Sequence, residues 1–319
     1  MNIRKDNMIL GWLLSAILTG LILSACSPSP PAGVPVPTAS TSYRGEDKQH
    51  VLSQFWYDGK AEVSVYALEQ VRYGEMRKGK AVAIFVTEDF SRSRHVKIDR
   101  PNPEPEDKVS VLKLNFSKEF NTGIYPYRMY LSSFTELGSG AFPEPLKIAS
   151  VIAEWCGIVY TQLNRTSTQY EVQNNSYFES EGSSRWTVPL QLAEDGIMNL
   201  IRINPELLPT GEVEMIPSTF FTRLKHKPIE AVAARCSLET SGDSLSVYRI
   251  EMPAYERAST FTFRRQPPFE IEAWTETYPE DGKPMTTRAT ILKRDKLPYW
   301  QLNTVKDSSA RSALGLLWR

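Results

Sequence analysis

The sequence contains few of the residues that usually carry catalysis or metal binding. Its 319 residues include three histidines and three cysteines. His50, His95 and His226 lie far apart, and no two have a metal-binding spacing such as H-E-x-x-H. Basic residues next to His95 and His226 also disfavour a bound cation. We therefore predict no metal site.

Motifs for nucleotide binding and acyl transfer are also missing. The chain has no P-loop, no G-x-G-x-x-G and no G-x-S-x-G pentapeptide. Its 37 basic and 37 acidic residues give a formal net charge of zero, which argues against a nucleic-acid partner. The sequence thus favours a protein without a cofactor, and it predicts no catalytic residue.

The amino-terminal segment has the features of a secretory signal peptide. Arg4 and Lys5 precede an apolar run from Met8 to Leu23 that is interrupted only by Gly, Ser and Thr. The run has 16 residues, fewer than the ~20 that a helix needs to cross the hydrocarbon core, and no charged residue closes its far side. We predict that residues 1–25 are a signal peptide rather than a lasting membrane span.

A cysteine with small neighbours follows the apolar run. Leu23-Ser24-Ala25-Cys26 resembles the lipobox of bacterial lipoproteins. The resemblance implies a diacylglyceryl thioether on Cys26, cleavage before it and acylation of the new amino terminus. Because two or more acyl chains anchor a protein stably, the lipid bilayer is the expected partner of acylated Cys26. The alternative is an ordinary signal peptide followed by a cysteine that is there by chance.

Residues 26–50 are rich in Pro, Ser and Thr and poor in bulky apolar side chains. Such a segment cannot bury a core, and its prolines favour extended conformations. We predict that it is an acylated tether and that the folded domain covers residues 51–319. The domain is long enough to hold one large core or two smaller ones.

The domain has the sequence pattern of an all-β protein. Ala61, Val63 and Val65 alternate with polar residues, which is the period expected of a half-buried strand. Gly-, Pro- and Asn-containing turns separate a dozen or so such segments, and the best helical stretch is residues 194–202. We predict a large antiparallel meander, as a curled sheet or half-barrel with one short helix. Two packed β lobes are the alternative. The segments that we predict as strands include 60–73, 81–86, 109–116, 125–134, 146–155, 168–172, 175–179, 185–190, 229–238, 244–252, 269–278 and 285–293.

Two further cysteines and two glutamates are the candidate site residues of the domain. The signal peptide implies an oxidising compartment, where a disulfide between Cys156 and Cys236 is plausible, although each could equally be a buried free thiol. Glu179 and Glu181 would lie on the same side of a strand, as glycoside hydrolysis could use. Two solvated glutamates at a strand end are the simpler alternative.

Aromatic residues cluster in Phe55-Trp56-Tyr57 and again at Tyr125, Tyr127 and Tyr130. A curved sheet with an aromatic-lined concavity could bind an apolar or sugar ligand, although rings at strand spacing usually belong to the core.

Three segments resemble a family of uncharacterised Bacteroidota lipoproteins: residues 55–62 (FWYDGKAE), 120–127 (FNTGIYPY) and 176–182 (SYFESEG). Some members carry the automatic label septum formation inhibitor, which belongs to an α/β pyrophosphatase with a Ser-Pro-Arg-Arg motif. The present chain has neither that motif nor βαβ alternation. In that phylum an acidic stretch after the acylated cysteine accompanies surface exposure. The uncharged residues 27–31 therefore imply a periplasm-facing anchor, and Ser27 favours the outer membrane.

Two functions from different classes remain open at this stage. The first is a non-catalytic envelope lipoprotein that binds an apolar ligand or a partner protein. The second is a periplasmic hydrolase of envelope glycan or peptide that uses Glu179 and Glu181. The sequence leans toward the first, because it holds no complete catalytic motif.

Overall fold

The computed structural model describes residues 52–100, 104–138 and 143–316. These residues belong to one compact unit, Ser42–Arg319. The predicted signal peptide, Cys26 and the predicted tether lie outside the described residues. Within the described ranges, no helix is long and apolar enough to cross a membrane.

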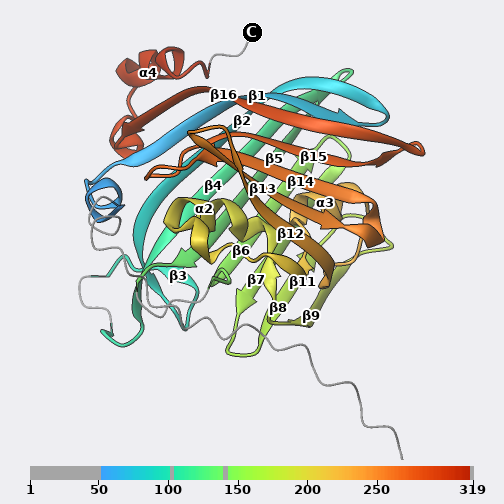
Figure 1. Cartoon of the computed structure of the whole chain (residues 1–319), viewed down its shortest axis with the longest axis horizontal. Coiled ribbons are helices and arrows are strands. Elements are labelled where there is room, and N and C mark those ends of the chain that lie inside the picture. The colour runs from blue at the N-terminus through green and yellow to red at the C-terminus, as the bar shows by residue number, and fades with distance from the viewer. Residues whose placement is uncertain (1–51, 101–103, 139–142, 317–319) are drawn as a thin grey trace, which may run out of the picture. The chain divides into compact units, whose positions relative to one another are not determined.

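The described residues form one curled 16-stranded sheet with a few short helices, which confirms the predicted all-β fold class (Figure 1). From β1 the sheet continues in one direction through β2, β4 and on to β9, and in the other through β16, β15 and on to β10. Neighbouring strands are antiparallel except for the pair of β10 and β11. The strands are β1 (Ala61–Arg72), β2 (Glu75–Ser91), β3 (Val96–Lys97), β4 (Lys108–Thr122), β5 (Tyr125–Glu136), β6 (Lys147–Glu154), β7 (Gly157–Arg165), β8 (Gln169–Asn175), β9 (Ser183–Pro189), β10 (Leu192–Ala193), β11 (Gly211–Ile216), β12 (Val232–Ser241), β13 (Leu245–Met252), β14 (Arg257–Arg264), β15 (Ile271–Glu280) and β16 (Lys283–Leu297).

Helices α2 and α3 pack inside the curled sheet, whereas α4 lies outside it (Figure 1). Helix α2 contacts β4, β5 and β15, and its residues Ile197, Leu200 and Ile201 are fully buried in the main core. The side chain of Asn199 donates to backbone oxygens of β4 and β5 at 3.2 Å. The interior is therefore packed rather than hollow. The helical segments are η1 (Glu194–Gly196), α2 (Ile197–Ile203), η2 (Pro205–Leu207), α3 (Thr219–Leu224), η3 (Pro253–Tyr255), η4 (Tyr299–Gln301), η5 (Val305–Asp307) and α4 (Ser308–Ala313).

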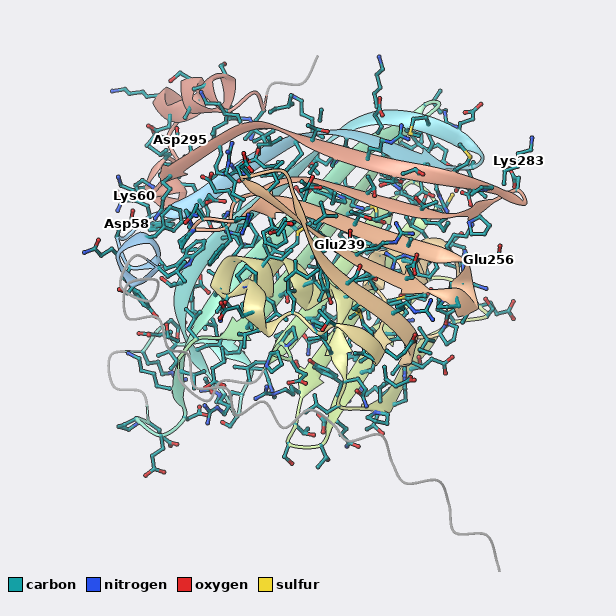
Figure 2. All side chains as sticks on the ribbon, in the orientation of Figure 1. Asp58, Lys60, Glu239, Glu256, Lys283 and Asp295 are labelled. Carbon is teal, nitrogen blue, oxygen red and sulfur yellow. The ribbon has the colours of Figure 1, made fainter. Side chains whose placement is uncertain are left out.

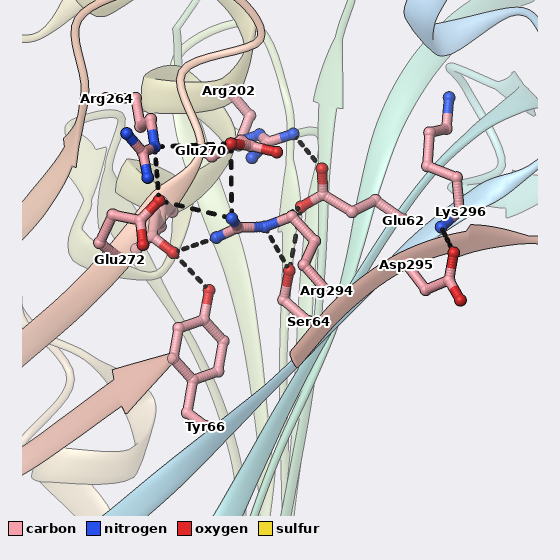
Figure 3. A network of polar contacts seen from close by, with 11 residues as sticks. Glu62, Ser64, Tyr66, Arg202, Arg264, Glu270, Glu272, Arg294, Asp295 and Lys296 are labelled. Carbon is pink, nitrogen blue, oxygen red and sulfur yellow. Dashed lines mark hydrogen bonds and ion pairs between the residues drawn. The ribbon is translucent and has the colours of Figure 1, made fainter. Parts of the chain in front are cut away.

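A buried ionic network fixes the carboxyl end of α2 to the sheet (Figure 3). The Arg202 side chain is fully buried and lies 2.5 Å from Glu62 of β1. Its guanidinium carbon is 5.1 Å from the centre of the Trp56 ring. Arg294 of β16 contacts the same carboxyl group at 3.5 Å and donates to Ser64 at 3.1 Å. The network thus joins the helix to strands from both ends of the domain.

Some predicted elements differ from the structure. The predicted helix at 194–202 is confirmed as η1 followed by α2. The predicted strand at 175–179 is wrong, because β8 ends at Asn175 and residues 176–182 form a loop. Strand β11 and helices α3 and α4 were not predicted. Helix α4 is followed by Leu314, which packs on Val63 and Val65.

Candidate functional site: an aromatic rim at one end of the sheet

Alternate turns of an antiparallel meander lie at the same end of the sheet. The turns that join β1 to β2, β4 to β5, β6 to β7 and β8 to β9 therefore share one end. Each carries an exposed apolar side chain: Tyr73 is 51% exposed, Ile124 84%, Trp155 68% and Tyr177 57%. We call these four residues, together with Tyr125, the aromatic rim. Exposed apolar residues are normally scattered, so this grouping indicates an interaction surface.

Contacts between the rings make the rim a continuous feature. The Tyr125 and Trp155 rings have centroids 6.2 Å apart. Tyr177 lies against Gly157, where an added Cβ would come within 2.4 Å of its ring. On the other side, the Tyr73 and Tyr125 hydroxyls are 3.5 Å apart. The rim therefore presents side chains that their neighbours already hold in place.

Arg72 supports the rim from beneath. Its guanidinium carbon lies 4.2 Å from the centre of the Tyr73 ring, and it donates to the Tyr127 hydroxyl at 3.1 Å. It also donates to the backbone oxygen of Leu224, at the end of α3, at 2.9 Å. A guanidinium stacked on aromatic faces holds such rings without covering their outer edges.

The predicted acidic pair lies beside the rim, in the β8–β9 loop. Glu179 is exposed and has no ion pair with another described residue. Glu181 is 2.6 Å from Nδ1 of His226 and 3.5 Å from Arg223. The interpretation that both glutamates lie on one side of a strand is wrong, because the loop turns Glu181 toward α3 while Glu179 stays exposed.

The surroundings of Glu181 favour the ionised form of its carboxyl group. Burial raises the pKa of this carboxyl, but hydrogen bonds from Ser176 and His226 and the charge of Arg223 outweigh it and hold the pKa below its ordinary value. A general acid needs a raised pKa instead. A serine hydrolase needs histidine between serine and carboxylate, whereas here the carboxylate lies between Ser176 and His226. The geometry supports neither reaction.

The two cysteines of the domain are both free thiols. Cys156 is exposed in the β6–β7 turn, next to Trp155 of the rim. Cys236 is buried in β12, and burial raises the pKa of its thiol. Of the two alternatives left open by the sequence, free thiols are therefore the one observed: Cys156 lies in an exposed turn, whereas Cys236 is buried in a strand of the other half of the sheet.

The inside of the curled sheet holds a small charged cavity of about 40 Å³. Its lining includes a Lys118–Glu276 ion pair and an Arg257–Glu194 pair at 2.6 Å. Beside them, burial raises the pKa of Asp195 to about 6. A water needs roughly 10–15 Å³ and a drug-sized ligand about 300 Å³ or more, so this cavity suits only a few waters. The hypothesis of an apolar cavity lined by Tyr125, Tyr127 and Tyr130 gains no support from it.

The sequence contains a signal for the rim, namely apolar residues in its turns. Tyr73, Ile124 and Trp155 each lie in a two- to four-residue turn, where polar residues are the norm. These turns alternate along the meander, so the topology places them together. Apolar residues that recur in every second turn of a predicted meander therefore indicate an exposed apolar end.

Comparisons with known proteins identify no family for this chain. No family model matches it, and no curated protein matches it. A solved structure described as a beta-barrel-like protein of a domain of unknown function, DUF1849, from Brucella abortus is similar in fold. The match has a TM-score of 0.45 and 11% sequence identity, and it covers 74% of this chain and 97% of that one.

Proposed function

We propose that this protein is a lipid-anchored, non-catalytic envelope protein that binds a partner protein through its aromatic rim. The observation that carries the proposal is the rim itself, with Tyr73, Ile124, Trp155 and Tyr177 exposed by 51 to 84% at one end of the sheet. Tyrosine and tryptophan are enriched in protein interfaces because they bury a large area at little cost in conformational entropy.

The rim and the amino-terminal start of β1 lie at opposite ends of the sheet, which favours a partner protein rather than the membrane as the binding partner of the rim. The chain enters β1 near Lys60, and the rim begins after Arg72, at the other end of the same strand. Twelve residues of strand span about 40 Å. Figure 2 shows Lys60 at one end of the domain and Lys283 at the other. Lys283 follows the β15–β16 turn, whose Asp281 lies next to Gly74 in the β1–β2 turn. The end at which the chain enters β1 is therefore opposite the rim, so a tether that starts at Cys26 would not cover the rim.

The geometry gives less support to two alternatives, the binding of an apolar ligand and a hydrolase activity. An apolar ligand needs a cavity, and the charged interior cavity of about 40 Å³ does not provide one. A glycan hydrolase that uses Glu179 and Glu181 would need both carboxyl groups at a cleft, but Glu179 is exposed to solvent and Glu181 is engaged by His226. A partner protein remains as the best occupant of the exposed surface.

Cys156 provides a natural probe of the rim. In the described residues it is the exposed thiol, whereas Cys236 is buried. We would attach a photoreactive crosslinker to Cys156 of the anchored protein in its own envelope and identify adducts by mass spectrometry. The variant pair Trp155→Ala and Tyr177→Ala tests the rim. Leu292→Ala is the matched control, because Leu292 is 59% exposed on β16, away from the rim.

We expect one adduct of defined mass that the rim variants abolish and the control retains. An adduct pattern that is the same in all variants would contradict the proposal, and so would an adduct between two copies of the chain. The anchor is tested separately by Cys26→Ser, which should yield an uncleaved and unacylated precursor. Normal acylation of that variant would contradict the anchoring proposal.

A further inference from the structure

A second concavity lies at the end of the sheet opposite the aromatic rim. The β2–β3 turn, the end of β5, the residue that precedes β6 and the β7–β8 turn line a cleft of about 520 Å³. We call it the basic cleft. Its described lining residues are Arg92, Ser93, His95, Glu136, Leu146, Arg165, Thr166 and Ser167. Pockets of 300–1,000 Å³ are of the size that binds small molecules.

The residues that line the cleft include two guanidinium groups, of Arg92 and Arg165, and one carboxylate, of Glu136, which contacts both. The carboxylate of Asp107 lies behind the lining, on the backbone N–H of Ser93. The Arg165 side chain is only 9% exposed, whereas that of Arg92 is 50% exposed and reaches toward solvent. A buried guanidinium at a cleft wall has strong electrostatic influence, because water screens it little.

The cleft is held in shape by the surrounding polar contacts. Asp107 accepts from the backbone N–H of Ser93 at 2.6 Å, which fixes the turn that carries Arg92. His95 contacts the backbone oxygen of Arg165 through Nε2 at 2.8 Å, which joins two of the three segments. Lys147, at the start of β6, donates to the backbone oxygen of His95 at 3.1 Å and so joins the third segment to the other two. The cation-bearing segments are thus organised before any ligand arrives.

We propose that the basic cleft binds a phosphate ester that carries hydroxyl groups. Guanidinium groups match phosphate oxygens in geometry and charge, and Arg92 has Nε and Nη1 unengaged by any described residue. The hydroxyls of Ser93, Thr166 and Ser167 can donate to ligand oxygens or accept from ligand hydroxyls. Such a ligand could be a phosphoglycerol lipid headgroup or a soluble sugar phosphate.

The place of the cleft in the fold gives the lipid source a physical route. The Thr87 hydroxyl of β2 donates to the backbone oxygen of Trp56 at 2.9 Å, so the first described residues lie at the same end as the β2–β3 turn. A chain anchored through its amino terminus would enter the domain at this end. Soluble phosphate esters could reach the same cleft from the periplasm.

Titration of the domain that begins at Ser42 tests the ligand class, since this unit is compact by itself. Glycerol phosphate is added during heteronuclear NMR, with sodium chloride at equal ionic strength as the control for salt. We expect saturable shifts in the millimolar range or tighter. Arg92→Gln should weaken binding about tenfold, as expected for the loss of a charge-assisted hydrogen bond. Arg249→Gln is the matched control, because Arg249 is 47% exposed and also pairs with a glutamate.

A second variant guards against an indirect effect of Arg92 on folding. Ser167 is exposed at the cleft, so Ser167→Glu adds a repelling charge without removing a buried group and should also weaken binding. Sedimentation with vesicles of phosphatidylcholine, with or without phosphatidylglycerol, distinguishes the sources. Binding only to phosphatidylglycerol vesicles would assign a lipid headgroup, and binding of glycerol phosphate without vesicle binding would assign a soluble ester.

Absence of saturable binding in both experiments would overturn the inference. So would equal binding by Arg92→Gln and Arg249→Gln. The inference is independent of the proposed rim function, because Trp155→Ala lies at the other end of the sheet and should leave glycerol phosphate binding unchanged.

Discussion

Replacement of Asp195 by asparagine should stabilise the domain at neutral and alkaline pH. Asp195 lies inside the curled sheet and accepts from the backbone N–H and the hydroxyl of Thr219 at 2.9 and 2.7 Å. Burial raises the pKa of its carboxyl from 3.8 to about 6, against the opposing effect of these hydrogen bonds. The ionised form is therefore disfavoured in the folded state. An asparagine keeps an oxygen acceptor at the same place and carries no charge.

The expected size of the effect follows from linkage between ionisation and folding. One pKa unit corresponds to about 1.36 kcal/mol, so a rise from 3.8 to about 6 costs the folded state about 3 kcal/mol when both states are ionised. Because the folded pKa is raised, this cost is absent below pH 3.8, grows as the pH rises to about 6 and is constant above it. At about pH 4.5 it is about 1 kcal/mol. The new amide N–H groups offset part of the gain, by about 1 kcal/mol if they stay unpaired.

Urea denaturation of the domain from Ser42 onward, at about pH 8 and about pH 4.5, measures the difference. Asp307→Asn is the matched control. Asp307 accepts from the backbone N–H and hydroxyl of Thr304 at 2.9 and 2.7 Å, the same distances as Asp195 and Thr219, but it is solvent-exposed and these bonds lower its pKa. Asp307→Asn should therefore destabilise slightly at about pH 8, with the opposite sign. A gain in Asp195→Asn that is identical at both pH values would refute the reasoning.

Three further predictions concern the ionic network and the rim. Arg202→Met should lower the free energy of unfolding by about 3–5 kcal/mol in urea denaturation, because the more distant Arg294 is then the remaining cation beside the buried Glu62. An unchanged midpoint would contradict this. Gly157→Ala should displace the Tyr177 ring, since an added Cβ would lie 2.4 Å from it, and should reduce the Cys156 adduct; an unaltered Tyr177 environment by NMR would show the clash to be absent. Glu181→Gln should destabilise above pH 4.5 and match the wild type at lower pH, because the pKa of Glu181 is lowered in the folded state; pH-independent destabilisation would refute the ion pair.

Local pattern was sufficient for much of the sheet. The period of two at Ala61, Val63 and Val65 and the apolar run at 81–86 predicted consecutive strands, which are the neighbouring strands β1 and β2 in the structure. Hairpins are specified by residues close in sequence, so local sequence patterns can reveal them. The predicted boundaries were too short where charged residues continue a strand, as in β2, which extends through residues 75–80.

Long-range contacts determine the elements that local sequence patterns do not predict, such as α3. Residues 219–224 (TFFTRL) have the composition of a strand, yet they form α3. Ser218 caps this helix, and the carboxylates of Glu194 and Asp195 accept from the first backbone N–H groups. Those carboxylates lie 24 residues away in the sequence. The residues next to Phe220 in the sequence therefore do not reveal that this segment is a helix.

In the candidate site, too, some features follow from local sequence and others depend on long-range contacts. Cys156 and Cys236 invited a disulfide, but pairing depends on which half of the sheet each occupies, and only the complete strand order reveals this. Likewise, Glu181 became an ion-pair partner of His226, 45 residues later, rather than a neighbour of Glu179. The rim was accessible from sequence in principle, because it depends only on the alternation of turns.

The pairing of β1 with β16 bears on how the domain is made. Ala61 lies opposite Leu297, so the first long strand completes its hydrogen bonds with the last one. A chain that leaves a ribosome or crosses a membrane from its amino terminus exposes β1 long before β16 follows. Until then β1 has one unpaired edge, which is a template for wrong pairing with other chains. Closing so distant a contact is also slow. We therefore expect that this edge of β1 needs protection while the chain is being made, until β16 pairs with it.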